Sequence, residues 1–220
     1  MSAYDQIADI YDQLFSDAQS LQENSELFDL LNWKSGETVL DIGCGTGLFW
    51  EYNTPEIYIG LDPSDRMLAN FAAKFPQAEG CLKHCKFEDY VGAGADLVIA
   101  LFGAASYIRP SAVSKIAKLT NPGGRYFVMF FGPGYSPVVN GATNLSIKHF
   151  MGSEALLPGK QTVFNNYTIV TGSVGAQNAQ SEPDNAAQTE PDSAAQNSLS
   201  ELDSAAQNSL SELDRPANFI

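Results

Sequence analysis

The segment VLDIGCGTG, residues 39–47, constrains the fold of this 220-residue chain more than any other stretch. Its first four residues are apolar or β-branched apart from Asp41, as is typical of a buried parallel strand. Glycines follow at positions 43, 45 and 47, where they permit backbone angles closed to other residues and let a ligand approach the main chain. A helix is expected over residues 46–52. A strand, a glycine turn and a helix in this order predict the nucleotide-binding corner of a doubly wound sheet.

The spacing of the glycines separates two classes of ligand. The dinucleotide fingerprint is G-x-G-x-x-G. Here Leu48 stands where that pattern has its third glycine, and Gly47 precedes it, so the spacing is G-x-G-x-G with an acid two residues before Gly43. This pattern resembles motif I of the class I S-adenosylmethionine-dependent methyltransferases. An NAD-dependent oxidoreductase is the alternative that this spacing disfavours.

A second apolar strand is expected over residues 57–61 and is followed at once by Asp62. A carboxylate at the tip of this strand can accept hydrogen bonds from the two hydroxyls of a ribose, which suits any adenosine-containing ligand. The residues after it, PSDRML, are similar to the methyltransferase pattern, in which a helix carries an apolar residue near adenine. Met67 would take that place beside Pro63, although packing into the core explains Met67 equally well.

The resemblance implies a set of cofactor contacts. Asp41 and the loop backbone would hold the methionine moiety of S-adenosylmethionine, and Asp62 would bind its ribose. Residues 86–88 occupy the place where relatives hold adenine, although many relatives carry an acid where this chain has Lys86. The implied cofactor-binding residues are Asp41, Gly43, Cys44, Gly45, Gly47, Asp62, Pro63, Met67, Phe87, Glu88 and Leu101.

Apolar periodicity predicts an alternation of strands and helices through the first 131 residues. Strands are expected at 38–42, 57–61, 79–84, 96–102 and 125–131, and helices at 4–15, 20–32, 46–52, 64–75 and 111–119. Such alternation predicts an α/β fold with a doubly wound, mostly parallel sheet and helices on both faces. Residues 1–172 are expected to form this domain, with residues 1–35 as a helical segment over the cofactor site.

The pattern weakens after Phe131. Residues 132–144 read as a Gly/Pro/Asn loop, residues 145–150 as a possible strand, and residues 152–158 as one or two helical turns. The segment TVFNNYTIVTG predicts a hairpin that turns at Asn165-Asn166, because asparagine tolerates positive φ. This region is short for the family, and its shortness leaves open a catalytically silent protein that only binds the cofactor.

Residues 173–220 differ in composition from the domain. DSAAQNSLSEL occurs twice in tandem, at 192–202 and 203–213. Such an acidic, low-complexity segment is expected to be disordered, because it holds too few apolar residues to form a core. The alternative is a lone helix, since the leucines and alanines recur with an eleven-residue period.

Charge and cysteine content limit the partners. The chain carries a net charge of −14, which is a poor match for nucleic acid. No apolar run reaches transmembrane length, and Met1 leads into polar residues, so no membrane association is expected. The three cysteines argue against a disulfide framework and favour a cytoplasmic protein. CLKHC, residues 81–85, has too few ligands for a closed zinc site, so no metal is expected.

The methyl acceptor is expected to be a small molecule. LFGAASY, residues 101–107, lacks the Asn/Asp-Pro-Pro-aromatic motif of enzymes that methylate nucleobase or glutamine amide nitrogens. No residue stands out as a general base, and the sequence does not indicate an oligomeric state. The candidates for lining the acceptor site are Tyr4, Tyr11, Tyr107 and His149, and each is also explained as a buried ring with a satisfied polar tip.

Overall fold

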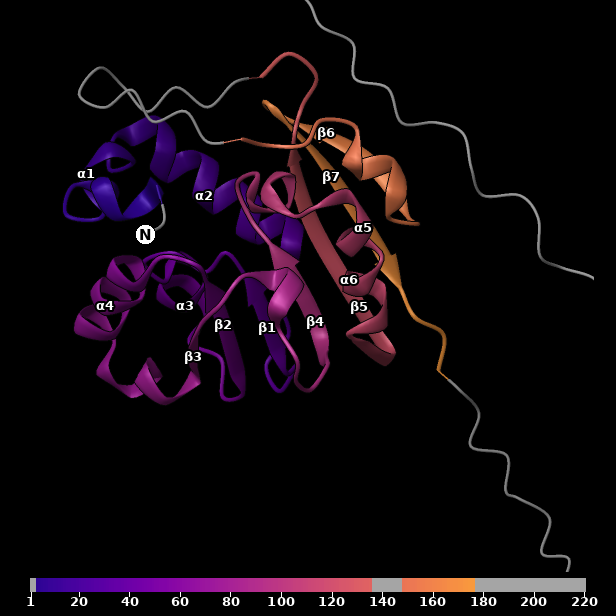
Figure 1. The fold of residues 1–220 in the computed structure, drawn as a ribbon, viewed down its shortest axis with the longest axis horizontal. Coiled ribbons are helices and arrows are strands. Elements are labelled where there is room, and N and C mark those ends of the chain that lie inside the picture. Colours follow the sequence, from indigo (N-terminus) through magenta and orange to yellow (C-terminus); the bar gives the residue numbers. More distant parts are fainter. Residues whose placement is uncertain (1–2, 136–147, 177–220) are drawn as a thin grey trace, which may run out of the picture. The chain divides into compact units, whose positions relative to one another are not determined.

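The computed structural model describes residues 3–135 and 148–176, and within them the chain forms one seven-stranded sheet (Figure 1). The strand order is β3-β2-β1-β4-β5-β7-β6. Strands β1 to β5 run parallel, whereas β7 is antiparallel to both β5 and β6. The strands are β1 (Val39–Ile42), β2 (Tyr58–Asp62), β3 (Leu82–His84), β4 (Ala95–Ala100), β5 (Thr120–Phe131), β6 (Lys160–Phe164) and β7 (Tyr167–Ser173).

Helices cover both faces of the sheet, as the expected α/β doubly wound fold requires. The α-helices are α1 (Tyr11–Leu14), α2 (Ala18–Leu31), α3 (Leu48–Asn53), α4 (Asp65–Lys74), α5 (Pro110–Val113) and α6 (Lys115–Lys118). The 3₁₀ helices are η1 (Ala3–Gln6), η2 (Pro76–Cys81), η3 (Phe87–Asp89), η4 (Ala104–Tyr107) and η5 (Ser153–Leu156). The sequence-based prediction of the fold class is therefore confirmed.

The core divides into two layers because successive strand residues point to opposite faces. Leu40, Val98 and Val128 pack on one face with side chains of α5 and α6. Val39 and Ile99 pack on the other face with side chains of α2, α3 and α4. Strands buried on both faces explain why the sequence shows apolar runs rather than strict alternation.

The strand order changes direction between β1 and β4. From β1 the chain builds outward through β2 and β3, then returns to place β4 and β5 on the other side of β1. Ligands of open α/β sheets bind at the carboxyl ends of the strands beside such a switch point. The glycine loop after β1 and the segment after β4 therefore border the expected site.

The helix predicted over residues 4–15 is not continuous. The structure has η1, a turn and the short α1. The amide of Ile10 donates to the carbonyl of Ile7, three residues earlier, and not to the carbonyl of residue 6, which would be its partner in an α-helix. The carbonyl of Asp5 accepts a hydrogen bond from Arg66, and that of Ala8 accepts one from Asn70. These hydrogen bonds to side chains of α4 accompany the irregular backbone of the segment.

Other boundaries also differ from the sequence-based prediction. The helix expected at 111–119 is divided at Ser114 into α5 and α6. Strand β5 begins five residues early, and its Pro-Gly-Gly stretch forms an irregularity opposite β4 between Ala95 and Leu97. Residues 148–150, the described part of the possible strand at 145–150, are not in a strand.

The hairpin of β6 and β7 forms as expected, and Asn165 in its turn has a φ of 49°. Strand β7 includes Ser173, and Val174 still exchanges hydrogen bonds with Gly123 and Gly124, so the sheet extends past residue 172. Most of the loop predicted at 132–144 and the repeats of the tail lie outside the described residues.

Candidate functional site

The glycine loop forms a tight turn at the carboxyl end of β1. The amides of Gly43 and Cys44 both donate to the carbonyl of Leu61, at 2.8 and 3.0 Å, which ties the loop to β2. Gly47 begins α3 with a φ of 94°, and a Cβ there would lie 2.6 Å from the ring of Phe71. Gly45 has a φ of 54°, and a Cβ there would meet no atom within 4 Å. The backbone at Gly45 therefore borders open space.

Asp62, the last residue of β2, joins the loop to the helix that follows. Its Oδ2 accepts the amide of Gly45 at 3.0 Å, and its Oδ1 accepts the amide of Ser64 at 2.8 Å. Burial raises the pKa of Asp62 to about 6, although both amide hydrogen bonds lower it. A carboxylate offers about four lone-pair positions, so each oxygen of Asp62 can accept a further hydrogen bond.

Asp41 lies beneath the loop, away from open space. Its side chain is 3% exposed, and its Oδ2 accepts the hydroxyl of Tyr58 at 2.8 Å. Burial raises the pKa of Asp41 to about 7, with a smaller rise from the charge of Asp62, while the Tyr58 hydrogen bond lowers it. Cys44 is buried beside this pair, and burial raises the pKa of its thiol.

A cavity of about 510 Å³ opens above the loop. Small-molecule sites in proteins occupy roughly 300–1,000 Å³. Eight predicted cofactor residues line it, from the ends of β1 to β4: Gly43, Gly45, Asp62, Pro63, Met67, Phe87, Glu88 and Leu101. Asp41, Cys44 and Gly47 do not line the cavity; all three are buried beneath or behind the loop.

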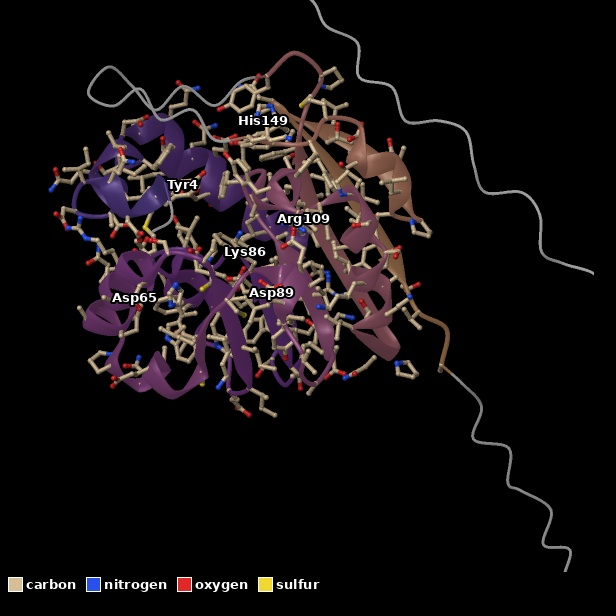
Figure 2. All side chains as sticks on the ribbon, in the orientation of Figure 1. Tyr4, Asp65, Lys86, Asp89, Arg109 and His149 are labelled. Carbon is tan, nitrogen blue, oxygen red and sulfur yellow. The ribbon has the colours of Figure 1, made fainter. Side chains whose placement is uncertain are left out.

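Three of the four predicted acceptor residues line the same cavity, namely Tyr4, Tyr11 and Tyr107. The hydroxyl of Tyr4 donates to that of Tyr107 at 3.1 Å, and the ring of Tyr4 meets those of Tyr11 and Tyr107 edge-on. Burial raises the pKa of all three phenols. His149 packs edge-on against Phe131 and does not line the cavity, whereas Tyr4 does (Figure 2).

The N-terminal segment is held over the cavity by polar contacts to the glycine loop and α4. The Ser64 hydroxyl donates to Oδ1 of Asp5 at 2.5 Å and also accepts the amide of Met67, which caps α4. The Thr46 hydroxyl donates to Oδ1 of Asp12 at 2.5 Å. Residues of the segment therefore contact the same loop and helix that carry the predicted cofactor residues.

Lys115 holds the loop of residues 87–90 from the side of α6. Its Nζ donates to the carbonyls of Phe87, Glu88 and Tyr90, at 2.9, 3.2 and 2.5 Å. It also lies 5.1 Å from the ring centroid of Phe87. Oε1 of Glu88 accepts the amide of Arg109 at 2.8 Å, so this loop is also tied to the segment after β4.

Several residues of the cavity wall were not predicted from the sequence. They are Ile42, Leu61, Cys85, Lys86, Phe102, Ala104, Ile108, Arg109, Lys148 and Phe150. Of these, Ile42, Leu61, Lys86 and Phe102 stood within segments that the resemblance had marked, although none of the four was itself given a role there. Ser64 carried a detectable signal, because a serine directly before an expected helix is a common N-cap. Nothing in the sequence indicated Lys115 or Tyr58 as partners of the site.

The part of the chain that the structure describes contains neither a metal cluster nor a membrane-spanning helix. No group of three or more His, Cys, Asp or Glu side chains there could hold a metal ion. None of the helices in those residues is long and apolar enough to cross a bilayer.

The central part of the chain is similar to known proteins. Residues 40–126 match the model of a family described as a methyltransferase domain. An uncharacterized methyltransferase of Schizosaccharomyces pombe is 30% identical over 135 residues, which cover 54% of this chain and 46% of that protein. The chain thus spans about half the length of that relative.

Solved structures support the fold. Magnesium protoporphyrin IX methyltransferase from Synechocystis, solved with bound S-adenosylmethionine, aligns over 78% of this chain and 96% of its own, with a TM-score of 0.51 and 14% identity. DesVI from Streptomyces venezuelae aligns over 59% of this chain and 60% of its own, at 27% identity and a TM-score of 0.48. The first of these likenesses, with a TM-score above 0.5, concerns the fold alone.

Proposed function

Because residues 40–126 carry a class I methyltransferase domain, we propose that the chain binds S-adenosylmethionine and transfers its methyl group to a small-molecule acceptor. The observation that carries the proposal is the joint position of Gly45 and Asp62 on one cavity, linked by a hydrogen bond of 3.0 Å. The glycine supplies backbone open to a ligand, and the acid supplies acceptors for hydroxyl groups.

The residues of the cavity fit the cofactor. The free lone pairs of Asp62 suit the two hydroxyls of a ribose. Met67 and Phe87 are buried side chains that reach the cavity wall, and together they suit the faces of an adenine ring. Glu88 uses Oε1 for the amide of Arg109 and keeps Oε2 for the adenine amino group. Lys86 is a donor only, so it cannot take the place of the acid that many relatives have there.

Asp41 is assigned a supporting role. Its carboxyl group contacts Tyr58 under the loop and does not line the cavity. It would act by holding the end of β1 and the loop in place, while the backbone of Gly43 and Gly45 meets the methionine moiety. Gly47 and Cys44 would support the loop in the same way, since both are buried.

When bound, S-adenosylmethionine supplies a sulfonium methyl group, which bonds to a lone pair of the acceptor while the electrons of the broken carbon–sulfur bond stay on sulfur. The protein must then orient the acceptor and exclude water. The N-terminal segment contributes Tyr4 and Tyr11 to the cavity wall, where their half-buried rings would restrict access of solvent.

The phenols are poor general bases. Burial raises the pKa of Tyr4, Tyr11 and Tyr107, so all three stay protonated at neutral pH and can position an acceptor by hydrogen bonding. His149 faces Phe131, outside the cavity wall. An acceptor that is already nucleophilic when bound therefore fits this site best.

The test is release of S-adenosylhomocysteine from S-adenosylmethionine in the presence of pooled metabolites, with RNA and peptide pools in parallel. Turnover with the metabolite pools is the expected result. Turnover on RNA or peptides alone would contradict the small-molecule acceptor. Binding of the cofactor without turnover on any pool would favour the catalytically silent alternative, and binding of NAD instead would favour the oxidoreductase.

A cytoplasmic location belongs to the same proposal. It is supported by the three cysteines, all of which are free thiols in the structure.

A further inference from the structure

Three basic side chains, Lys86, Arg109 and Lys148, line the cavity. This is unexpected in a chain with 26 acidic and 12 basic residues. Of the acidic side chains in the described part of the chain, two, Asp62 and Glu88, line it with them. The cavity therefore has the opposite balance of charge from the chain as a whole.

Among the residues that the structure describes, these three cations have no carboxylate partner. Elsewhere in residues 3–135 and 148–176, Arg66, Lys74 and Arg125 form ion pairs of 2.6 to 2.9 Å with acidic residues. Within the same residues, no carboxylate lies within ion-pair distance of Lys86, Arg109 or Lys148. The ammonium group of Lys148 instead lies 5.6 Å from the centroid of the Phe150 ring.

The acidic groups of the cavity are already engaged. Both oxygens of Asp62 accept backbone amides, and the proposed cofactor would take its remaining lone pairs. Oε1 of Glu88 accepts the backbone amide of Arg109, which leaves the guanidinium of Arg109 without a carboxylate partner. An incoming negative charge would therefore meet unpaired cations.

Two of the cations come from segments that also carry predicted acceptor residues, since Arg109 follows Tyr107 by two residues and Lys148 precedes His149. The amide of Phe150 donates to the carbonyl of Ser106 at 2.7 Å, which fixes residues 148–150 against η4. Arg109 follows η4 directly, two residues after Tyr107. Arg109 and Lys148 thus line the cavity from the segments that carry Tyr107 and Phe150. Lys86 comes from the loop after β3, and Figure 2 labels it together with Arg109.

The rest of this wall is aromatic. Tyr4, Tyr107, Phe102 and Phe150 line the cavity together with the apolar Ile108. Aromatic and aliphatic side chains bind the apolar body of a ligand, and a few charged groups fix its orientation. From this combination, and resting on the function proposed above, we infer that the acceptor is a small organic anion, with an apolar or aromatic body and a carboxylate or phosphate recognised by Lys148 and Arg109.

An anionic acceptor also agrees with the chemistry of the site. The bound cofactor would carry a positive sulfonium group, which attracts a nearby anion. Lys148 and Arg109 would hold the acceptor by charge, and the hydroxyl of Tyr107 would add a hydrogen bond. Arginine and lysine both suit this role, since each remains charged at neutral pH.

The test measures binding of four matched probes to the full chain saturated with S-adenosylhomocysteine: naphthoate, naphthyl phosphate, naphthamide and naphthylmethylamine. One or both anions should bind at least tenfold more tightly than the amide, with the amine weakest. The anion that binds more tightly shows whether the acceptor carries a carboxylate or a phosphate. Raising the salt concentration to about 0.5 M should weaken only the anions, because salt screens exposed charges.

Variants assign the effect to residues. Lys148→Met and Arg109→Met should each lower the affinity for the preferred anion at least fivefold and leave that for naphthamide within twofold. Lys160→Met, which removes an exposed lysine of β6 outside the cavity, is the matched control. It should change neither the affinity for the anion nor that for naphthamide. Binding of S-adenosylhomocysteine to each variant checks that the domain is folded.

Equal affinity for naphthoate, naphthyl phosphate and naphthamide in the wild-type chain would overturn the inference. So would an anion preference that survives both substitutions. If S-adenosylhomocysteine does not bind, the proposed function fails, and the same probes on the unliganded chain then decide whether the cavity selects anions.

Discussion

The buried pair of Asp41 and Tyr58 leads to a quantitative prediction on stability. The Asp41 carboxyl group has a pKa of about 7 in the folded chain, against an ordinary value of 3.8. Between these two values the unfolded chain has lost the proton while the folded chain still keeps it. Stability therefore falls as the pH rises through this window and is constant on either side of it. A difference of about three in pKa corresponds to about 4 kcal/mol.

The substitution Asp41→Asn removes this titration while keeping the shape of the side chain. The amide oxygen can still accept the hydroxyl of Tyr58, but the NH₂ group lacks an evident partner, which costs about 1–3 kcal/mol at every pH. The test of the Asp41 titration is therefore how the free energy of unfolding changes with pH, and not its value at any one pH. Relative to wild type, the variant should gain about 4 kcal/mol of stability between pH 4 and pH 7.5.

The assay is urea unfolding at several pH values, followed by tryptophan fluorescence. Trp50 is a suitable reporter, because it is 5% exposed and lies 5.1 Å from the Tyr58 ring. Asp29→Asn, which removes an exposed carboxylate of α2, is the control and should run parallel to wild type. If the curves for wild type and Asp41→Asn are parallel as well, the account of the buried carboxyl group is refuted.

Other predictions concern cofactor binding and the N-terminal segment. Asp62→Ala should weaken binding of S-adenosylhomocysteine by about 1–3 kcal/mol and Asp62→Asn by less, and equal affinities in calorimetry would exclude Asp62 as the ribose ligand. Because the ionised form of Asp62 accepts these hydrogen bonds and its pKa is about 6, affinity should fall as the pH drops below 6, and Asp62→Asn should abolish that dependence. Ser64→Ala removes the cap of α4 and the contact to Asp5, so it should cost about 1–2 kcal/mol of stability and speed hydrogen exchange in residues 3–15 relative to β5. Proteolytic removal of residues beyond about 176 should leave cofactor affinity within twofold, and a loss of binding would show that the tail contributes.

The central strands and the glycine loop were predictable because their signals are local. Each signal lies in contiguous residues: an apolar run, a turn with three glycines, or an acid at the tip of a strand. The structure brings Gly45 and Asp62 together as these signals imply. Asp62 was predicted one residue beyond its strand and is the last residue of β2. The boundaries of β1 and β4 differ from the prediction by one or two residues, whereas β3 begins three residues late and β5 five residues early, because hydrogen bonding at element ends depends on neighbours.

The features that were missed depend on contacts between distant segments. The N-terminal residues show helical periodicity, but their backbone is irregular where Arg66 and Asn70 bond to two of its carbonyls. Lys148 reads as an ordinary surface lysine until residues 148–150 are seen to bond to Ser106. Tyr58 and Asp41 stand 17 residues apart, and only the parallel pairing of β1 with β2 brings them together. Local patterns carry no information on such pairings.

The most direct test of the central claim is calorimetric titration of the full chain with S-adenosylmethionine, S-adenosylhomocysteine and NAD. The account predicts binding of the first two with micromolar dissociation constants, equivalent to about −7 to −8 kcal/mol, and no measurable binding of NAD. Heat on addition of NAD alone, or no heat with either sulfur compound at about 1 mM, would contradict it.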